Sequence, residues 1–286
     1  MSIIITFQKY VRPQSLEEAW ELNQKKRHRI VAGMMWLKMG KHSFGTAIDL
    51  CDLGLDEIEE TENEFRIGAM ATLRQMEKHP GLAAYSCGAV EAAFKDIVGV
   101  QFRNGATLGG SLWRRMGFSD IVTVFMAMDS YVELFEGGIV PLEEFVDMKY
   151  DKDLLVRIIV KKQPGAFTYQ AVRKQRTDLP SLNCAASKLG DEYRVVVGST
   201  VMSADEIDQK HISWDIVGNH LSIQFDFDFH YSISPKVIRA RRVRTGTNAF
   251  RYSALPHMFP DTGTVFAAYS AKEAALSSVI PLAKMP

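Results

Sequence analysis

The feature that most constrains this chain is a glycine-rich string, R-N-G-A-T-L-G-G-S-L, at residues 103–112. Gly109 and Gly110 have no side chains, so a ligand can approach their backbone amides closely. Thr107 and Ser111 add hydroxyl donors. A diphosphate carries about two negative charges and needs several convergent donors to replace its water. The string predicts a phosphate-binding loop, although a tight turn in a sheet protein would also explain two adjacent glycines.

Short strands and short helices are expected to alternate around this string, which is itself expected to be a loop over residues 102–112. Hydrophobic patterns and turn residues predict strands at an amino-terminal segment and at residues 29–31, 47–50, 58–61, 65–69, 131–135, 154–160, 167–172, 182–187 and 193–197. Capping patterns and helical periodicity predict helices starting at Ser15, Thr72, Ser119 and Ser203, and spanning residues 82–94, 141–145 and, weakly, 265–282. The pairs Ser15 with Glu18 and Thr72 with Gln75 are expected to form reciprocal capping boxes.

The chain of 286 residues is expected to contain about two α+β domains, on a prior of roughly 150 residues each. The first would span residues 1–160, in subdomains of about 1–55 and 56–160. The second would span residues 161–286 and become irregular after about residue 228. A basic run in this tail favours a solvated face or a subunit contact over nucleic acid; it comprises Lys236, Arg239, Arg241, Arg242 and Arg244.

Charge and residue usage exclude several classes of protein. Lys plus Arg and Asp plus Glu both total 34, so no global field attracts nucleic acid or an anionic membrane. No apolar run approaches the roughly 20 residues that span a bilayer, and the start lacks a secretory cleavage pattern. Three scattered cysteines cannot supply the four ligands of an iron–sulfur cluster. We therefore expect a cytoplasmic protein without a disulfide framework.

Catalytic motifs are missing from the sequence as well. The histidines show no H-E-x-x-H or paired metal spacing, and G-x-S-x-G, Walker A and G-x-G-x-x-G patterns are not found. We expect neither a catalytic residue nor a metal site in this chain.

The whole string 103–112 resembles the R-N-x-A-T-L-G-G-N-[IL] signature of the FAD-binding domain of molybdenum hydroxylases. This family includes the medium subunits of xanthine dehydrogenase and carbon monoxide dehydrogenase. The resemblance continues in the Ser119–Asp120 pair and in P-L-x-x-F at residues 141–145. Upstream, I-D-L at residues 48–50 and I-G-A-x-x-T at residues 67–72 follow in the same order. The ordered set covers roughly residues 1–228 and is more specific than any one motif.

The resemblance implies a PCMH-type fold, with FAD between two small α+β subdomains. It implies that the FAD-binding residues are Ala32, Gly33, Met34, Met35, Trp36 and Leu37 in a first loop, Thr107, Gly109, Gly110 and Ser111 in a second, Asp120 at a sugar hydroxyl, and Asp178 and Leu179 beside the isoalloxazine ring. Without the resemblance, Leu179 would be interpreted as an ordinary core leucine. Neither loop contains histidine, so the cofactor is expected to be non-covalent.

The implied function is that of a flavin-carrying, electron-transfer subunit of a xanthine dehydrogenase-like molybdenum hydroxylase. A large partner subunit would carry molybdopterin, and a small one would carry [2Fe–2S] clusters. Electrons would pass through FAD to NAD or another acceptor. The chain's part would be to position the ring and tune its potential.

The first loop departs from the family pattern A-G-G-T-[DN], because residues 32–36 read A-G-M-M-W. The change removes a glycine suited to positive φ and a threonine hydroxyl. The alternative is therefore a flavin-free structural subunit in which Met34, Met35 and Trp36 serve packing. The tail departs too, since the family's helical closing segment with an aromatic–Arg pair has no counterpart. It is either divergent or the product of a frame shift, which sequencing the locus beside a close relative would decide.

Overall fold

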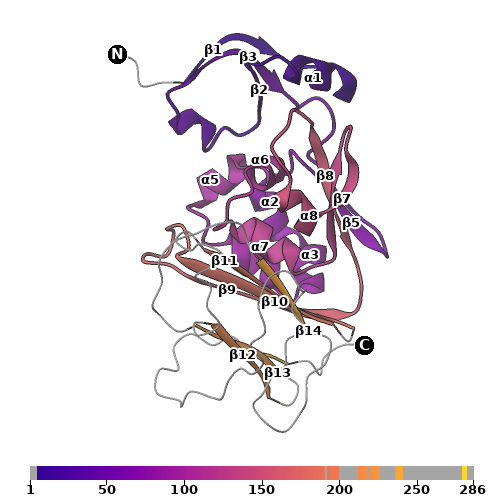
Figure 1. The fold of residues 1–286 in the computed structure, drawn as a ribbon, viewed down its shortest axis with the longest axis vertical. Helices are drawn as coiled ribbons and strands as arrows, with labels where there is room; N and C mark the ends of the chain where they lie inside the picture. Colours follow the sequence, from indigo (N-terminus) through magenta and orange to yellow (C-terminus); the bar gives the residue numbers. More distant parts are fainter. Residues whose placement is uncertain are drawn as a thin grey trace.

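A computed structural model describes residues 5–190 and 192–199, together with strands at residues 212–217, 220–225, 236–240 and 279–281. Figure 1 shows a small sheet with one helix at one end, a helical middle flanked by a second sheet, and further sheets at the other end. Within the described residues, none of the helices combines the length and apolarity that crossing a bilayer requires. The mixture of helices and strands agrees with the predicted α+β class.

The first lobe is a parallel sheet in the order β1-β3-β2, formed by β1 (Thr6–Val11), β2 (His28–Val31) and β3 (Ser43–Asp49). Parallel strands need a crossover connection, and α1 (Leu16–Asn23) supplies it between β1 and β2. The short helix η1 (Leu37–Met39) follows β2.

The start of α1 differs from the expected reciprocal capping box. The Ser15 hydroxyl accepts from the Glu18 amide at 3.2 Å, as predicted. The Glu18 carboxylate, however, accepts from the amide of Gln14 at 2.7 Å, one residue before the cap. The box predicted at Thr72 is confirmed, because Thr72 and Gln75 each cap the other's backbone amide.

The second lobe is built on an antiparallel sheet in the order β4-β5-β8-β6-β7. Its strands are β4 (Ile58–Glu60), β5 (Glu64–Gly68), β6 (Ser130–Leu134), β7 (Gly138–Pro141) and β8 (Leu155–Lys161). Its helices are α2 (Leu73–Lys78), α3 (Pro80–Tyr85), α4 (Ala89–Phe94), α5 (Val100–Gly105), α6 (Leu108–Trp113), α7 (Asp120–Met126) and α8 (Leu142–Asp147). The predicted division of the chain at residues 55 and 160 stays a prediction.

Two predictions in this lobe are wrong. The single helix expected over residues 82–94 is broken between α3 and α4, where Cys87 and Gly88 have φ of 52° and 81°. The loop expected over residues 102–112 is the helix pair α5 and α6. Thr107 separates the two helices and caps α6 through a hydrogen bond from the amide of Gly110. Such a cap stabilises the start of a helix, and it offsets part of the helix stability that Gly109 and Gly110 cost α6.

The third layer is an antiparallel sheet in the order β14-β11-β10-β9. Its strands are β9 (Gly165–Val172), β10 (Leu182–Leu189), β11 (Glu192–Ser199) and β14 (Lys236–Ala240). Helices α4 and α7 pack against this sheet, so Phe94, Phe125 and Phe167 share one core. A separate sheet contains β12 (Ile212–Val217), β13 (His220–Phe225) and β15 (Val279–Pro281).

The tail contains structure that the sequence did not predict. Strand β14 lies in the segment expected to lack periodicity, and β15 is a strand where a weak helix was expected. Lys236 and Arg239 of the basic run lie on β14. The cap predicted at Ser203 and Glu206, and the arginines at 241, 242 and 244, lie outside the described residues.

Candidate cofactor-binding site

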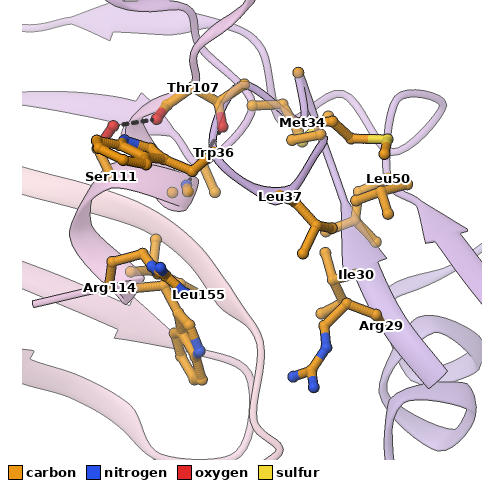
Figure 2. Close-up of a pocket in the computed structure, with 18 of the residues that line it drawn as sticks. Arg29, Ile30, Met34, Trp36, Leu37, Leu50, Thr107, Ser111, Arg114 and Leu155 are labelled. Carbon is orange, nitrogen blue, oxygen red and sulfur yellow. Dashed lines mark hydrogen bonds between the residues drawn. The ribbon is translucent and has the colours of Figure 1, made fainter. Parts of the chain in front are cut away.

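A cavity of about 430 Å³ lies between the first sheet and the second lobe, with its lining drawn in Figure 2. Its volume falls in the range typical of small-molecule sites, roughly 300–1,000 Å³. The structure brings both predicted glycine loops to its wall. The lining from these loops comprises Ala32, Gly33, Met34, Met35, Trp36 and Leu37, together with Thr107, Gly109, Gly110 and Ser111.

The first loop is held tightly against the end of α5. A β-carbon on Gly33 would lie 1.4 Å from the carbonyl oxygen of Gly105, so only glycine fits at position 33. A β-carbon on Gly105 would lie 2.1 Å from the methyl group of Met35, which occupies that space. Met34 has φ of 55°, the left-handed conformation that glycine adopts readily. The loop therefore keeps a glycine-like backbone at Met34, at a cost in strain.

The two loops differ in their free hydrogen-bond donors. Across the described part of the chain, the backbone amides of residues 33–37 donate to no protein acceptor. The second loop uses its amides internally: those at residues 108, 109, 110 and 111 donate to Ala71 O, Ala69 O, Thr107 Oγ1 and Thr107 O. Successive free amides form a concavity suited to an anion. The first loop, more than the second, can therefore hold a phosphate through its backbone.

Cations from distant parts of the chain add to this site. Arg29, Arg114 and Lys152 all line the cavity, and Figure 2 draws Arg29 and Arg114 on opposite sides of it. The Arg29 guanidinium lies 5.1 Å from the centre of the Phe44 ring. Burial and the charge of Arg29 lower the pKa of Lys152 below its usual 10.5. These residues were not predicted from the sequence, because their spacing in the chain gives no sign that they converge.

The lining also includes the carboxylates of Asp151 and Asp153. Asp153 is committed to the protein, since its carboxylate accepts from the amides of Glu136 and Gly137. Its negative charge is thereby stabilised by backbone donors. The three cations and the free amides leave the cavity suited to an anionic ligand.

Asp120 does not line this cavity. Its buried carboxylate accepts hydrogen bonds from the Tyr169 hydroxyl, from Arg173 at 2.7 Å and from Asn183 at 3.5 Å. Burial raises the pKa of Asp120, although the charge of Arg173 and these hydrogen bonds act in the opposite direction. Asp120 is thus already satisfied within the protein.

Asp178 and Leu179 lie in the connection between β9 and β10, also away from the cavity. Arg173 donates to the carbonyl oxygen of Asp178 at 2.6 Å and so ties this connection to Asp120. Leu179 is 45% exposed, so its interpretation as a core leucine is wrong. Arg173 was not predicted from the sequence, because its partners come from two different segments of the chain.

The fold and the cavity define the class of this protein as a two-lobed α+β domain with a cavity between its lobes. The family described as the FAD binding domain in molybdopterin dehydrogenase matches residues 5–162, and the chain belongs to that family. This confirms the resemblance inferred from the motifs and, with it, the expected PCMH-type fold. The free amides of the first loop and the close approach of Gly33 to Gly105 fit a cofactor that carries a diphosphate.

Two known proteins are similar to this chain over about two thirds of its length. YgfM, an uncharacterized protein of Escherichia coli (strain K12), is 28% identical over 188 residues, which cover 63% of this chain and 69% of YgfM. The nicotine 6-hydroxylase medium subunit of Paenarthrobacter nicotinovorans is 24% identical over 215 residues, covering 68% and 75% of the two chains.

Solved structures share the fold at lower identity. A reconstituted CO dehydrogenase from Oligotropha carboxidovorans has a TM-score of 0.61 at 21% identity, covering 70% of this chain and 78% of that one. Quinoline 2-oxidoreductase from Pseudomonas putida 86 has a TM-score of 0.59 at 19% identity, covering 68% and 74%.

Replacing Met34 by glycine is expected to stabilise the protein by about 1 kcal/mol. A left-handed conformation costs an ordinary residue roughly 1–2 kcal/mol, and the greater chain entropy of glycine cancels part of the relief. Thermal or urea unfolding measures the change. Met35→Gly is the matched control, because it loses the packing over Gly105 without relieving a positive φ, and it should destabilise. Equal shifts in the two variants would exclude strain at Met34 as the cause.

Proposed function

We propose that this chain is the FAD-carrying, electron-transfer subunit of a xanthine dehydrogenase-like molybdenum hydroxylase. The observation that carries the proposal is that residues 33–37 line a cavity between two lobes in a chain of this family, and that their backbone amides donate to no described protein acceptor. Bound FAD would supply the ability to accept electrons singly and release them as a pair. The protein residues would hold the cofactor, orient it and exclude competing reactions.

In this proposal the residues 32–37 hold the diphosphate non-covalently, and the hydroxyls of Thr107 and Ser111 add contacts from the second lobe. Asp178 and Leu179 lie beside the isoalloxazine ring, and the exposed side chain of Leu179 supports such a contact. The proposed bond from Asp120 to a sugar hydroxyl has less support, because its carboxylate is already engaged.

The proposed partners follow from the family. A large subunit would carry molybdopterin, a small subunit would carry [2Fe–2S] clusters, and NAD or another acceptor would receive the electrons in the cytoplasm. A relative named as a medium subunit supports assembly with other chains. Isolating the complex through a tag on this chain tests this point. Recovery of the chain alone from its native host would count against the assembly.

A flavin-free structural subunit is the second candidate. It is favoured by the loss of glycine and threonine from the first loop and by the internal bonding of the amides at residues 108–111. In this case the cavity would be a remnant of the family's cofactor site.

Titration of the purified chain with FAD distinguishes the two candidates. We expect uptake of one FAD per chain, visible flavin absorbance after gel filtration, and release of intact FAD on denaturation, since the linkage is non-covalent. A colourless protein that takes up no FAD at excess cofactor would refute the flavin role and leave the structural one.

A further inference from the structure

Trp36 is a large aromatic side chain exposed at the cavity. It is 46% exposed and lines the cavity from the first loop. Trp20 and Trp113 each contact a phenylalanine ring, with centroids 6.3 and 6.0 Å apart. Trp36 makes no ring contact among the described residues. Its apolar surface is therefore open on the side of the cavity.

The backbone that carries Trp36 is fixed on both sides. Before it, Gly33 and Met35 are pressed against Gly105. After it, the amide of Lys38 donates to the carbonyl of Met34 at 2.9 Å, and the amide of Met39 donates to that of Trp36 at 3.1 Å. The loop thus fixes the point from which the indole extends.

The indole also extends toward the second loop. Figure 2 draws Trp36 extending from the first loop in the direction of Ser111 and Thr107, and all three residues line the cavity. It therefore stands beside the free amides that are suited to phosphate. A planar ring joined to that phosphate would meet the indole face.

We propose that Trp36 is a stacking platform for an aromatic ring of the bound dinucleotide. The inference rests on the proposed function, because it takes the diphosphate to lie on the amides of residues 33–37. Stacking on an indole needs only a planar π-system, so adenine and isoalloxazine share the chemistry. Stacking covers the exposed indole and favours a dinucleotide over inorganic phosphate or pyrophosphate.

The test compares the wild type with Trp36→Ala and Trp36→Phe, with Trp20→Phe as the matched tryptophan control. Each protein is titrated with FAD, ADP, FMN and pyrophosphate, and both affinity and indole fluorescence are followed. We expect Trp36→Ala to bind FAD about tenfold more weakly, in line with the loss of one stacked base. Trp36→Phe should keep most of the affinity and lose the quenching that ring binding causes. Trp20→Phe should match the wild type in both.

The ADP and FMN titrations distinguish adenine from isoalloxazine as the stacked ring. The comparison of wild type and variants distinguishes the stacking hypothesis from the proposed binding of FAD. Loss of affinity for ADP in Trp36→Ala assigns the platform to adenine, and loss for FMN assigns it to isoalloxazine. If the wild type binds FAD and Trp36→Ala binds it equally well with the same quenching, stacking is refuted while the flavin role stands. If the wild type binds none of the ring ligands, both are refuted. Pyrophosphate affinity should be the same in all four proteins, and circular dichroism confirms that each is folded.

Discussion

Arg103→Met is expected to lower the free energy of unfolding by about 3 kcal/mol, because it leaves a buried carboxylate with one of its cations removed. Arg103 and Glu77 have side chains that are only 5% and 4% exposed. Arg103 Nε lies 2.8 Å from Glu77 Oε2, and its other nitrogens reach Glu77 Oε1 and the carbonyl of Ile97. Arg74 still pairs with Glu77 at 2.8 Å, which places the loss at the lower end of the usual range.

Urea unfolding with a matched surface variant tests this expectation. Arg66→Met removes an arginine from an ion pair with Glu64 whose side chains are 44% and 22% exposed, and it should cost less than about 1 kcal/mol. The double variant Arg103→Met/Glu77→Leu should recover much of the loss, since it leaves no buried charge unpaired. A loss no larger than that of Arg66→Met would show that the buried pair is energetically unimportant.

The contribution of this pair also depends on pH. Burial raises the pKa of Glu77, but hydrogen bonds and charge from Arg103 and Arg74 outweigh it and bring the pKa below its usual 4.5. A depressed carboxyl pKa adds stability that is fully present above the pKa of the unfolded chain and is lost as pH falls through the folded one. The difference between wild type and Arg103→Met should therefore shrink in acid.

The same region shows what the sequence could predict and what it could not. The capping box at Thr72 and Gln75 was predictable because its two hydrogen bonds join residues three apart. The residues of the glycine string line the cavity, and their role in binding phosphate stays a prediction, but their conformation was wrongly predicted as a loop. The helix α6 tolerates Gly109 because its backbone packs on Ala69, where a β-carbon would come within 2.8 Å. A contact of this kind depends on another segment and leaves no trace in the local pattern.

Residues that act together from distant segments were the hardest to predict. Arg29 and Lys152 come from different lobes and both line the cavity. The zero net charge of the chain gave no indication that cations gather there. Arg173 joins Asp120 to Asp178, and no motif marks it. Family motifs identified the ends of this link and missed the residue that connects them, because the connection exists only after α7 packs on the sheet that contains β9 and β10.

Gly33→Ala should have the largest effect on cofactor binding. The added β-carbon would fall 1.4 Å from Gly105 O and 2.3 Å from Gly105 C, both of which are backbone atoms. No side chain can turn away to relieve this overlap, so the first loop must shift by about an ångström or more to restore normal contact distances. A displacement of that size breaks hydrogen bonds from the loop amides to the phosphate, and a hydrogen bond to a charged group contributes roughly 1.5–3 kcal/mol, so losing one or two of them costs about 100-fold in affinity. We expect FAD affinity to fall by about this factor, with a stability loss of about 1–3 kcal/mol from overpacking.

Gly99→Ala is the matched control for this prediction, because a β-carbon there meets nothing within 4 Å and its φ of −134° suits any residue. It should bind FAD and unfold as the wild type does. Isothermal titration with FAD and urea unfolding of both variants give the comparison. If Gly33→Ala lost FAD affinity only to the extent expected from its lower free energy of unfolding, the cause would be a general loosening of the fold. Among the described residues, the run of successive amides without a protein acceptor lies in the first loop, at residues 33–37. A Gly33→Ala protein that is destabilised but binds FAD normally would therefore show that the diphosphate is bound elsewhere.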